Sequence, residues 1–195
     1  MLGPSESDKI LLILDLDETL IHARETPLDR AADFVIYGYH IYRRPFLDEF
    51  IAICAEHFDL AVWSSASDDY VKAVVQHIFP DPQALRFVWG RSRATLRRAI
   101  ADEFGYSEYS LGHMNYTKPL QKVARNGWDL RRVLIVDDSP EKLVRNYGNA
   151  IYPAPFEGDE GDQELQKLAS YLQTLRDCEN VRSIEKRTWR ASLGE

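Results

Sequence analysis

The amino-acid sequence predicts an α/β protein built on a Rossmann-like parallel sheet with flanking helices. Three short apolar runs, at residues 10–14, 60–63 and 133–136, have the length and composition of strands buried on both faces, as in parallel sheets. Helical patterns lie between the runs, and each run ends directly before acidic or hydroxyl residues. Because parallel sheets bind ligands at the carboxyl ends of their strands, we expect these ends to form one site.

A hairpin and a helix are predicted between the first two strands. Residues 34–42, with Gly38 at their centre, have the composition of a strand pair. A helix is expected over 46–57 with Pro45 in its first turn, where proline is favoured. After the second strand, Ser67 is a suitable cap for a further helix whose first turn carries acidic residues.

The second half of the chain is predicted to contain a small insertion and four short helices. The insertion covers about residues 80–114 and includes a short strand at 87–89. The helices are expected at 95–104, closed by Gly105; at 119–125, closed near Gly127; at 141–146, opened by Ser139 and Pro140; and after Asp162, with Leu165, Leu168, Leu172 and Leu175 facing inward.

One domain is expected over residues 10–178, with a flexible stretch at 1–9, a mobile tail at 179–195 and no large cap. The two cysteines among the 195 residues, Cys54 and Cys178, exclude a disulfide scaffold and a Cys-based zinc site.

Charge and hydropathy limit the classes of partner. The chain has 24 Lys and Arg against 31 Asp and Glu, a net charge of −7, so no nucleic-acid partner is expected. The longest apolar run is too short to cross a bilayer and no signal peptide is visible. We therefore expect a soluble intracellular protein without a membrane partner, cytoplasmic or, in a eukaryote, nuclear.

Two pairs of acidic residues follow predicted strands. Asp15 and Asp17 come after the first strand, and Asp137 and Asp138 come after the last. Close carboxylates repel each other and favour a shared cation or proton. Because hard oxygen ligands suit Mg²⁺, all four aspartates are predicted metal ligands.

The same strand ends suit phosphoryl transfer. One carboxylate of the first pair can attack phosphorus, while the second protonates the leaving oxygen and then activates water. The hydroxyl of Ser64 or Ser65 and the ammonium group of Lys118 can stabilise the phosphoryl oxygens. Each residue has an ordinary alternative as a turn residue, helix cap or solvated lysine. The order of acid pair, hydroxyl, lysine and second acid pair favours the catalytic interpretation.

Four segments together resemble the haloacid dehalogenase superfamily of aspartate-based phosphotransferases. The match is closer to the branch of phosphatases that act on the carboxy-terminal domain of RNA polymerase II, also called NLI-interacting-factor-like. The segments are residues 15–22, 42–50, 116–120 and 130–140. The resemblance implies a fold of that superfamily, Mg²⁺ as cofactor and an aspartyl-phosphate intermediate.

The resemblance also implies residue roles. Asp15 would be the nucleophile and Asp17 the general acid and base. Thr19 ends the D-x-D-x-T string and is a further candidate catalytic residue. The remaining motif residues are Ser64 as the phosphate-binding hydroxyl, Lys118 as the lysine of the third motif, and Asp137 and Asp138 as the metal-binding pair.

Three positions depart from the usual pattern of this branch. The branch usually has threonine in the second motif, and here Ser64 and Ser65 compete for that role, with the spacing to Tyr70 favouring Ser64. Pro119 stands where the branch commonly has Asp. Asp138 is Asn in the smallest members and Asp in larger ones.

Three functions are compatible with these residues. The first is a phosphomonoesterase that acts on phosphoserine or phosphothreonine in a protein or peptide. The second is a small-molecule or nucleotide phosphatase, and the third is a catalytically silent binding module on the same fold. Retention of both Asp15 and Asp17 argues against the third.

Other residues near the motifs admit two interpretations each. The basic stretch of Arg91, Arg93, Arg97 and Arg98 is either a docking patch or a solvated face. The hairpin tyrosines Tyr37, Tyr39 and Tyr42 either line a groove or pack the strand pair. His22 either polarises the site or is structural.

Overall fold

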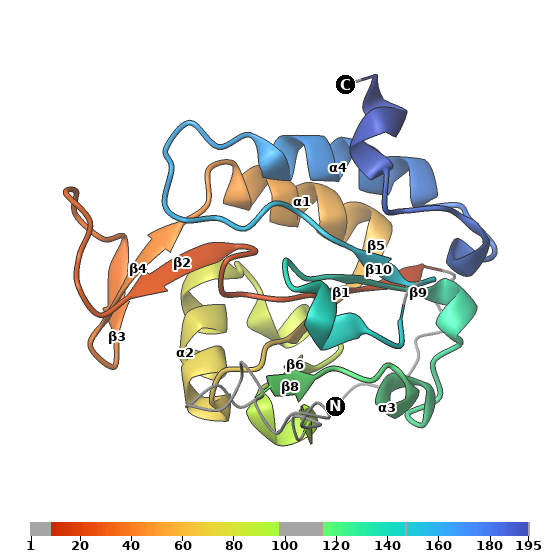
Figure 1. The fold of residues 1–195 in the computed structure, drawn as a ribbon, viewed down its shortest axis with the longest axis horizontal. Coiled ribbons are helices and arrows are strands. Elements are labelled where there is room, and N and C mark those ends of the chain that lie inside the picture. Colours follow the sequence, from red (N-terminus) through yellow and green to blue (C-terminus); the bar gives the residue numbers. More distant parts are fainter. Residues whose placement is uncertain (1–8, 98–114, 147, 195) are drawn as a thin grey trace, which may run out of the picture.

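The computed structural model describes residues 9–97, 115–146 and 148–194, and its centre is a five-stranded parallel sheet (Figure 1). The strand order is β10-β9-β1-β5-β6. The strands are β1 (Ile10–Leu14), β5 (Phe58–Trp63), β6 (Val88–Trp89), β9 (Val133–Val136) and β10 (Ala150–Ile151). The three predicted strands and the short strand near 87–89 are confirmed, and so is the predicted parallel α/β architecture.

The central strand β1 sends its side chains alternately into two cores. Leu12 and Leu14 belong to one hydrophobic cluster, while Leu11 and Ile13 belong to a second cluster on the other face. All five residues of β1 are buried, which explains why the strand reads as an unbroken apolar run.

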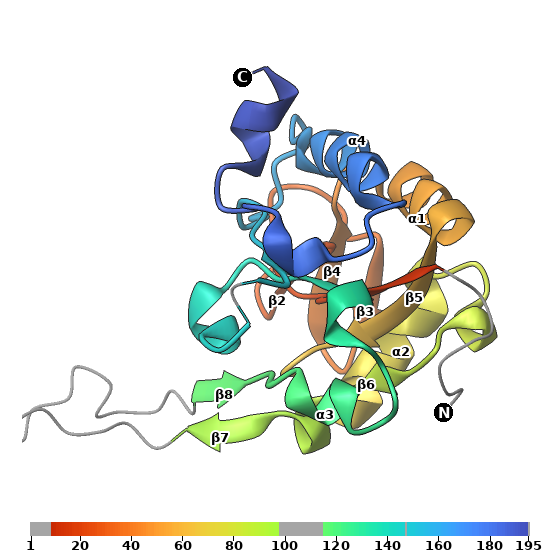
Figure 2. The same ribbon diagram turned by 90° about the vertical axis from the view of Figure 1, so that its right-hand side faces the viewer.

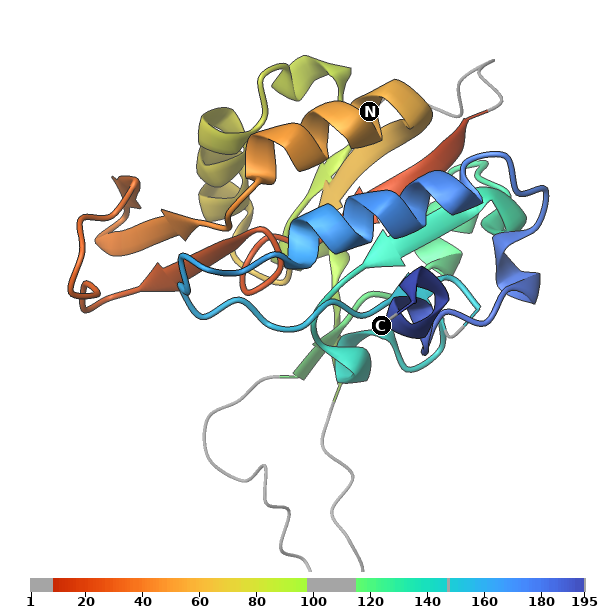
Figure 3. The same ribbon diagram turned by 90° about the horizontal axis from the view of Figure 1, so that it is seen from above.

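Helices cover both faces of the sheet. They are α1 (Leu47–His57), α2 (Asp68–Ile78), α3 (Gln121–Ala124) and α4 (Glu164–Leu175). Helices α1 and α4 lie side by side across one face (Figure 3), and the four predicted inward leucines of α4 are buried. Within the described ranges, no helix combines the length and the apolar character that crossing a membrane requires.

A second, three-stranded sheet projects beside the main one (Figure 1). Its strands are β2 (Ile21–Arg24), β3 (Phe34–Ile36) and β4 (Tyr39–Arg43), in the order β2-β4-β3. The predicted strand pair is confirmed, and Tyr37 and Gly38 form its two-residue turn with φ of 50° and 87°, as a turn of type I′ requires. Strand β2 was not predicted, because its four residues alone carry no clear alternation.

The predicted helix at 95–104 is wrong at its start. Thr95–Arg97 form strand β7, which pairs antiparallel with β8 (Asn115–Thr117), and the two strands form a separate two-stranded sheet (Figure 2). Pairing with β8 supplies the backbone hydrogen bonds that a helix would otherwise provide. Residues 98–104 of the predicted helix, Gly105 and Arg98 lie outside the described residues. No large cap is present among the residues that the structure describes.

Two predicted helix starts also differ. Helix α1 begins at Leu47, after Phe46 in a left-handed conformation with φ of 64°, so Pro45 precedes the helix instead of entering its first turn. The helix predicted at 141–146 is a short 3-10 helix, η4 (Pro140–Leu143).

The C-terminal segment differs from the mobile tail that we expected. The short 3-10 helices η5 (Val181–Ser183) and η6 (Trp189–Leu193) follow α4, and the side chains of Val181 and Trp189 are buried. Trp189 packs against Tyr171 of α4, and Arg190 forms an ion pair with Glu164. The apolar residues are too widely spaced to produce a periodic pattern, so their packing was not predictable from the sequence.

Arg44 joins the start of α1 to the loop before α4. Its guanidinium group is buried and donates from Nε and Nη2 to the two carboxylate oxygens of Asp162, at 2.9 and 2.8 Å. Its Nη1 donates to the backbone carbonyl of Thr19 at 3.0 Å. Asp162 also accepts from the backbone N–H of Glu164, so one ion pair connects three segments that are distant in sequence.

We predict that Arg44→Met lowers the free energy of unfolding by about 3 kcal/mol, because it leaves a half-buried carboxylate and a buried carbonyl without their donor. Urea denaturation at neutral pH measures the loss. The matched control is Arg131→Met, which removes an ion pair with Asp129 on the surface and should leave the stability nearly unchanged. Similar losses in the two variants would contradict the role of Arg44.

The same pair has a defined pH dependence. Burial alone would raise the pKa of Asp162, but the hydrogen bonds from Arg44 hold it below its ordinary value. The stabilisation is therefore present above the unfolded-state pKa and is lost as pH falls through the folded-state pKa. The difference in stability between wild type and Arg44→Met should shrink below about pH 4.

Candidate active site

The carboxyl ends of β1 and β9 bring three carboxylates together. One oxygen from each of Asp15, Asp137 and Asp138 lies within 4.8 Å of the others. Asp15 and Asp137 are fully buried, and the backbone N–H of Asp15 donates to the carbonyl of Val136 at 3.0 Å. The hydrogen-bonded register of two neighbouring strands therefore holds the cluster in place.

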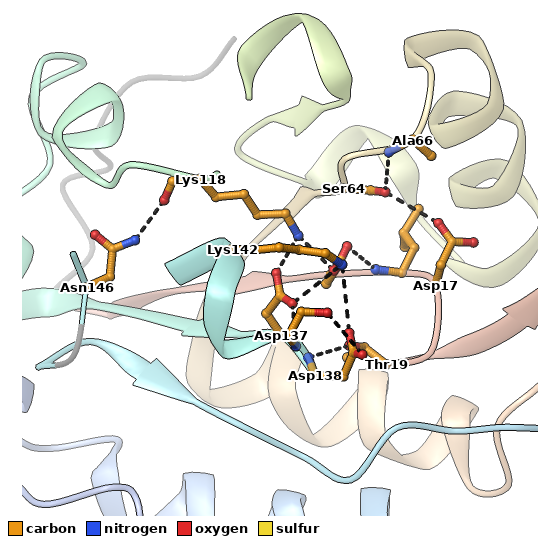
Figure 4. Close-up of polar contacts among 12 residues, drawn as sticks. Asp17, Thr19, Ser64, Ala66, Lys118, Asp137, Asp138, Lys142 and Asn146 are labelled. Carbon is orange, nitrogen blue, oxygen red and sulfur yellow. Dashed lines mark hydrogen bonds and ion pairs between the residues drawn. The ribbon is translucent and has the colours of Figure 1, made fainter. Parts of the chain in front are cut away.

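Lys118, which follows β8, lies between the two buried carboxylates (Figure 4). Its Nζ is 2.7 Å from Oδ2 of Asp15 and 2.6 Å from Oδ2 of Asp137, and its side chain is fully buried. The loop that carries Lys118 is fixed by Asn146, whose side-chain amide donates to the Lys118 carbonyl at 2.7 Å.

The two buried carboxylates have opposite titration behaviour. Burial alone would raise the pKa of Asp15, but the ammonium groups of Lys118 and Lys142 hold it below its ordinary value. Burial and the charge of Asp15 raise the pKa of Asp137 to about 7. Asp15 is therefore the carboxylate that stays ionised at neutral pH, as a nucleophile must.

Asp17 points away from the other three aspartates. Its Oδ1 accepts a hydrogen bond from the hydroxyl of Tyr70 at 2.8 Å, and its Oδ2 lies 3.4 Å from the hydroxyl of Ser64. Burial and the nearby charge of Asp15 raise the pKa of Asp17 to about 6, a suitable value for an acid and base near neutrality. The sequence predicted Asp17 as a fourth metal ligand, but its side chain is not part of the three-carboxylate cluster.

The structure distinguishes Ser64 from Ser65. Ser64 is buried at the end of β5, and its hydroxyl accepts from the backbone N–H of Ala66 at 3.0 Å while facing Asp17 (Figure 4). Ser65 instead contacts Arg91: its backbone carbonyl accepts a hydrogen bond from Nε of Arg91 at 2.9 Å. Of the two serines, Ser64 is therefore the one whose hydroxyl faces Asp17.

Thr19 has a different position from the other candidate catalytic residues. Its buried hydroxyl accepts from the backbone N–H of Asp138 at 3.2 Å. It therefore connects the loop after β1 to the loop after β9 and helps to place the third carboxylate.

Lys142 was not predicted from the sequence. It lies in η4, and its Nζ is 3.3 Å from Oδ2 of Asp15, with Asp137 and Asp138 slightly farther away. Burial alone would lower the pKa of Lys142, but these carboxylates raise it above its ordinary value. The only signal in the sequence is the i,i+4 spacing from Asp138, which is common on helix surfaces without a function.

The three-carboxylate cluster fits a divalent cation. Its donors are hard oxygen atoms, which Mg²⁺ prefers. Oδ1 of Asp138 is buried and accepts no hydrogen bond, so it has a free coordination position. Asp15, Asp137 and Asp138 are therefore the residues that would hold the ion.

A groove opens beside Asp17. Its volume is about 400 Å³, and it is lined by Asp17, Ala23, Tyr37, Tyr39, Ala66, Ser67, Tyr70 and Arg91. Tyr37 is 71% exposed, and Tyr39 contacts Tyr70 edge to face. Two of the three hairpin tyrosines thus line a groove, as one interpretation of the sequence proposed.

Tyr42 and His22 lie outside this groove. Tyr42 is buried in the hairpin, and its hydroxyl accepts from the backbone N–H of Leu28 at 2.7 Å. The ring of His22 packs against the rings of Tyr42 and Phe156, which favours the structural interpretation of this residue. Of the basic stretch, Arg91 lines the groove and Arg93 stacks on Trp89.

Comparison with known proteins agrees with this geometry. The sequence model of the family described as NLI interacting factor-like phosphatase matches residues 10–182. The chain is 32% identical to human carboxy-terminal domain RNA polymerase II polypeptide A small phosphatase 1 over 92% of its own length and 64% of that protein. It is 30% identical to CTD small phosphatase-like protein 2 of Dictyostelium discoideum over 93% of its own length and 30% of that protein.

A solved structure has the same fold. The structure of Fcp1, described as an essential RNA polymerase II CTD phosphatase, superposes with a TM-score of 0.62 at 19% identity, covering 86% of this chain and 62% of that one. Our chain spans less than two thirds of each of these three proteins. The resemblance stated from the sequence motifs is confirmed at the level of family and fold.

We predict that Thr19→Val lowers the free energy of unfolding by about 1 kcal/mol, because it leaves the partly buried N–H of Asp138 without its acceptor. It should also weaken Mg²⁺ binding, since the backbone of Asp138 is no longer fixed. Urea denaturation and calorimetric titration with Mg²⁺ measure the two effects. Thr19→Ser keeps the hydroxyl and should restore Mg²⁺ affinity; a Val variant as stable and as tightly binding as wild type would contradict this assignment.

Proposed function

The chain belongs to the family of NLI interacting factor-like phosphatases, and we propose that it is a Mg²⁺-dependent phosphomonoesterase that acts on phosphoserine or phosphothreonine in proteins. The observation that carries the proposal is the pairing of Asp15 with Asp17. Asp15 is a buried carboxylate that two ammonium groups keep ionised, and Asp17, two residues later in the chain, has a raised pKa. In this arrangement Asp15 can act as the nucleophile and Asp17 as the acid.

In the first step, a carboxylate oxygen of Asp15 forms a bond to phosphorus while the bond from phosphorus to the substrate oxygen breaks. Asp17, which titrates near neutrality, donates its proton to the leaving oxygen. The hydroxyl of Tyr70 holds the Asp17 carboxyl group, and Ser64 lies at its other oxygen.

In the second step, Asp17 takes a proton from water as the water oxygen attacks phosphorus. The bond between Asp15 and phosphorus breaks, which releases inorganic phosphate and restores both carboxyl groups. Lys118 stays beside Asp15 and offsets negative charge in both steps. Mg²⁺ bound at the carboxylate cluster would neutralise phosphoryl oxygens and reduce their repulsion of Asp15.

A protein substrate is supported by the groove beside Asp17. A groove of this size, lined by tyrosines and open to solvent along the hairpin, can hold an extended peptide next to its phosphorylated residue. Within the described residues no large cap encloses the site, which leaves it accessible to a peptide. The relatives with 32% and 30% identity are named for phosphatases of a protein domain.

We predict that Asp15→Asn abolishes hydrolysis of para-nitrophenyl phosphate in Mg²⁺, because an amide cannot form the acyl phosphate. Asp17→Asn keeps the nucleophile but should slow formation of the aspartyl-phosphate, because the leaving oxygen is no longer protonated, and should slow its hydrolysis, because no base activates water; rapid-quench kinetics would detect both effects. Near-normal turnover by Asp15→Asn would refute the assignment of the nucleophile. Unchanged burst and steady-state rates in Asp17→Asn would remove Asp17 from the mechanism.

We predict that Tyr37→Asn raises KM for phosphopeptides severalfold and leaves hydrolysis of para-nitrophenyl phosphate unchanged, because the nitrophenyl group lies at the Asp17 end of the groove and does not extend to Tyr37. Asn tolerates the left-handed conformation of the turn, so the hairpin should fold. The control is Val35→Thr, at an exposed position of β3 that does not line the groove.

A panel of phosphopeptides, sugar phosphates and nucleotides tests the class of substrate directly. Preference for sugar phosphates or nucleotides over every peptide would indicate a small-molecule phosphatase instead. No Mg²⁺-dependent hydrolysis of any member of the panel would favour a binding module.

A further inference from the structure

Lys142 places a second cation in the carboxylate cluster. Its Nζ lies 3.3 Å from Oδ2 of Asp15. The corresponding distances to Oδ1 of Asp137 and Oδ1 of Asp138 are 3.8 and 3.9 Å. These three carboxylates are also the candidate ligands of the divalent ion. The ammonium group therefore lies where the ion would bind (Figure 4).

We propose that Lys142 is a built-in counter-ion that occupies the carboxylate cluster when no metal is bound and that Mg²⁺ must displace. The inference rests on the proposed function, since it concerns the metal site of the same reaction. An ammonium group and a divalent cation repel each other and cannot occupy the same position among the three carboxylates. Binding of Mg²⁺ therefore includes the cost of moving Lys142.

The contacts of the two site lysines support a division of roles. Lys118 is fully buried and lies within 2.7 Å of both of its carboxylates, so it is fixed. The side chain of Lys142 is 21% exposed, and its three distances are all longer, between 3.3 and 3.9 Å. Lys142 is thus the ammonium group that can leave without opening the protein.

The surroundings of Lys142 provide a place for the displaced group. A cavity of about 140 Å³ borders Lys142 and is also lined by Thr95, Thr117, Pro119 and Arg145, among others. A lysine side chain has a flexible four-carbon stem, so its ammonium group can move several ångströms without a change in the backbone. The displaced ammonium group remains beside the site, where it can contact a phosphoryl oxygen of the substrate.

The cluster also explains why a counter-ion is useful. Carboxylates removed from water are destabilising unless they are paired. Lys118 forms ion pairs with Asp15 and Asp137. Within the described residues, the ion pair of Asp138 is with Lys142 and not with Lys118. Lys142 reaches all three, so the metal-free protein keeps a balanced site at the expense of Mg²⁺ affinity.

The test measures Mg²⁺ binding without turnover. Lys142→Met and Lys142→Gln remove the charge with little change in length, and calorimetric titration of the purified protein gives their dissociation constants for Mg²⁺. We expect both variants to bind Mg²⁺ at least about tenfold more tightly than wild type. In EDTA they should melt at a lower temperature than wild type, and added Mg²⁺ should raise their melting temperature more.

The matched control is Lys72→Met. Lys72 is an exposed residue of α2 whose Nζ lies 3.7 Å from Asp69, so this variant removes one positive charge from the chain without touching the cluster. It should bind Mg²⁺ as wild type does. A similar gain in affinity in Lys72→Met would assign the effect to net charge and overturn the inference.

The outcomes separate this inference from the proposed function. Equal or weaker Mg²⁺ binding by both Lys142 variants, with Mg²⁺-dependent hydrolysis retained by the wild type, overturns the role of Lys142 and leaves the phosphatase assignment intact. If neither the wild type nor the variants bind Mg²⁺, the metal-dependent function fails and the inference fails with it.

Discussion

The candidate active site of this protein depends on the electrostatic balance of carboxylates that are buried at one edge of a parallel sheet. Asp15 and Asp137 are removed from water and lie close enough to share one ammonium group, that of Lys118. Without that cation, both burial and mutual repulsion would oppose their ionisation. The lysine resolves the conflict unequally: it keeps Asp15 ionised, while Asp137 titrates near neutrality. The ionised state of Asp15 is therefore a consequence of how the site is neutralised.

The position of β1 explains why the site forms at this edge. Strand β1 is flanked by β5 and β9, and the chain crosses from one side of β1 to the other between them. The loops after β1 and β9 consequently leave the sheet together, and hydrogen bonds such as that from Asp138 to Thr19 join them. The buried strands hold Asp15 and Asp137 at the sheet edge, whereas the hairpin sheet beside them lines an exposed groove next to Asp17.

Many of these features could be predicted because they are local in the sequence. Strand β1 must be apolar on both faces, so its position is visible as an unbroken run, and the acids that follow it are visible as a pair. The two-residue turn of the hairpin was indicated by Gly38. By contrast, β7 was mistaken for the start of a helix, because its three residues acquire their structure only by pairing with β8.

The sequence by itself determined the class of fold, the places of the three long central strands β1, β5 and β9 along the chain, and the chemical types of the residues at their ends. Tertiary structure decided which of those residues meet and which charges they share. Lys142 lies 127 residues after Asp15, and Arg44 lies 118 residues before Asp162, yet each pair is in direct contact. No local pattern encodes such pairs, because their proximity results from the packing of the whole sheet and its helices. The cation that balances the site, and the direction in which Asp17 points, are properties of that packing.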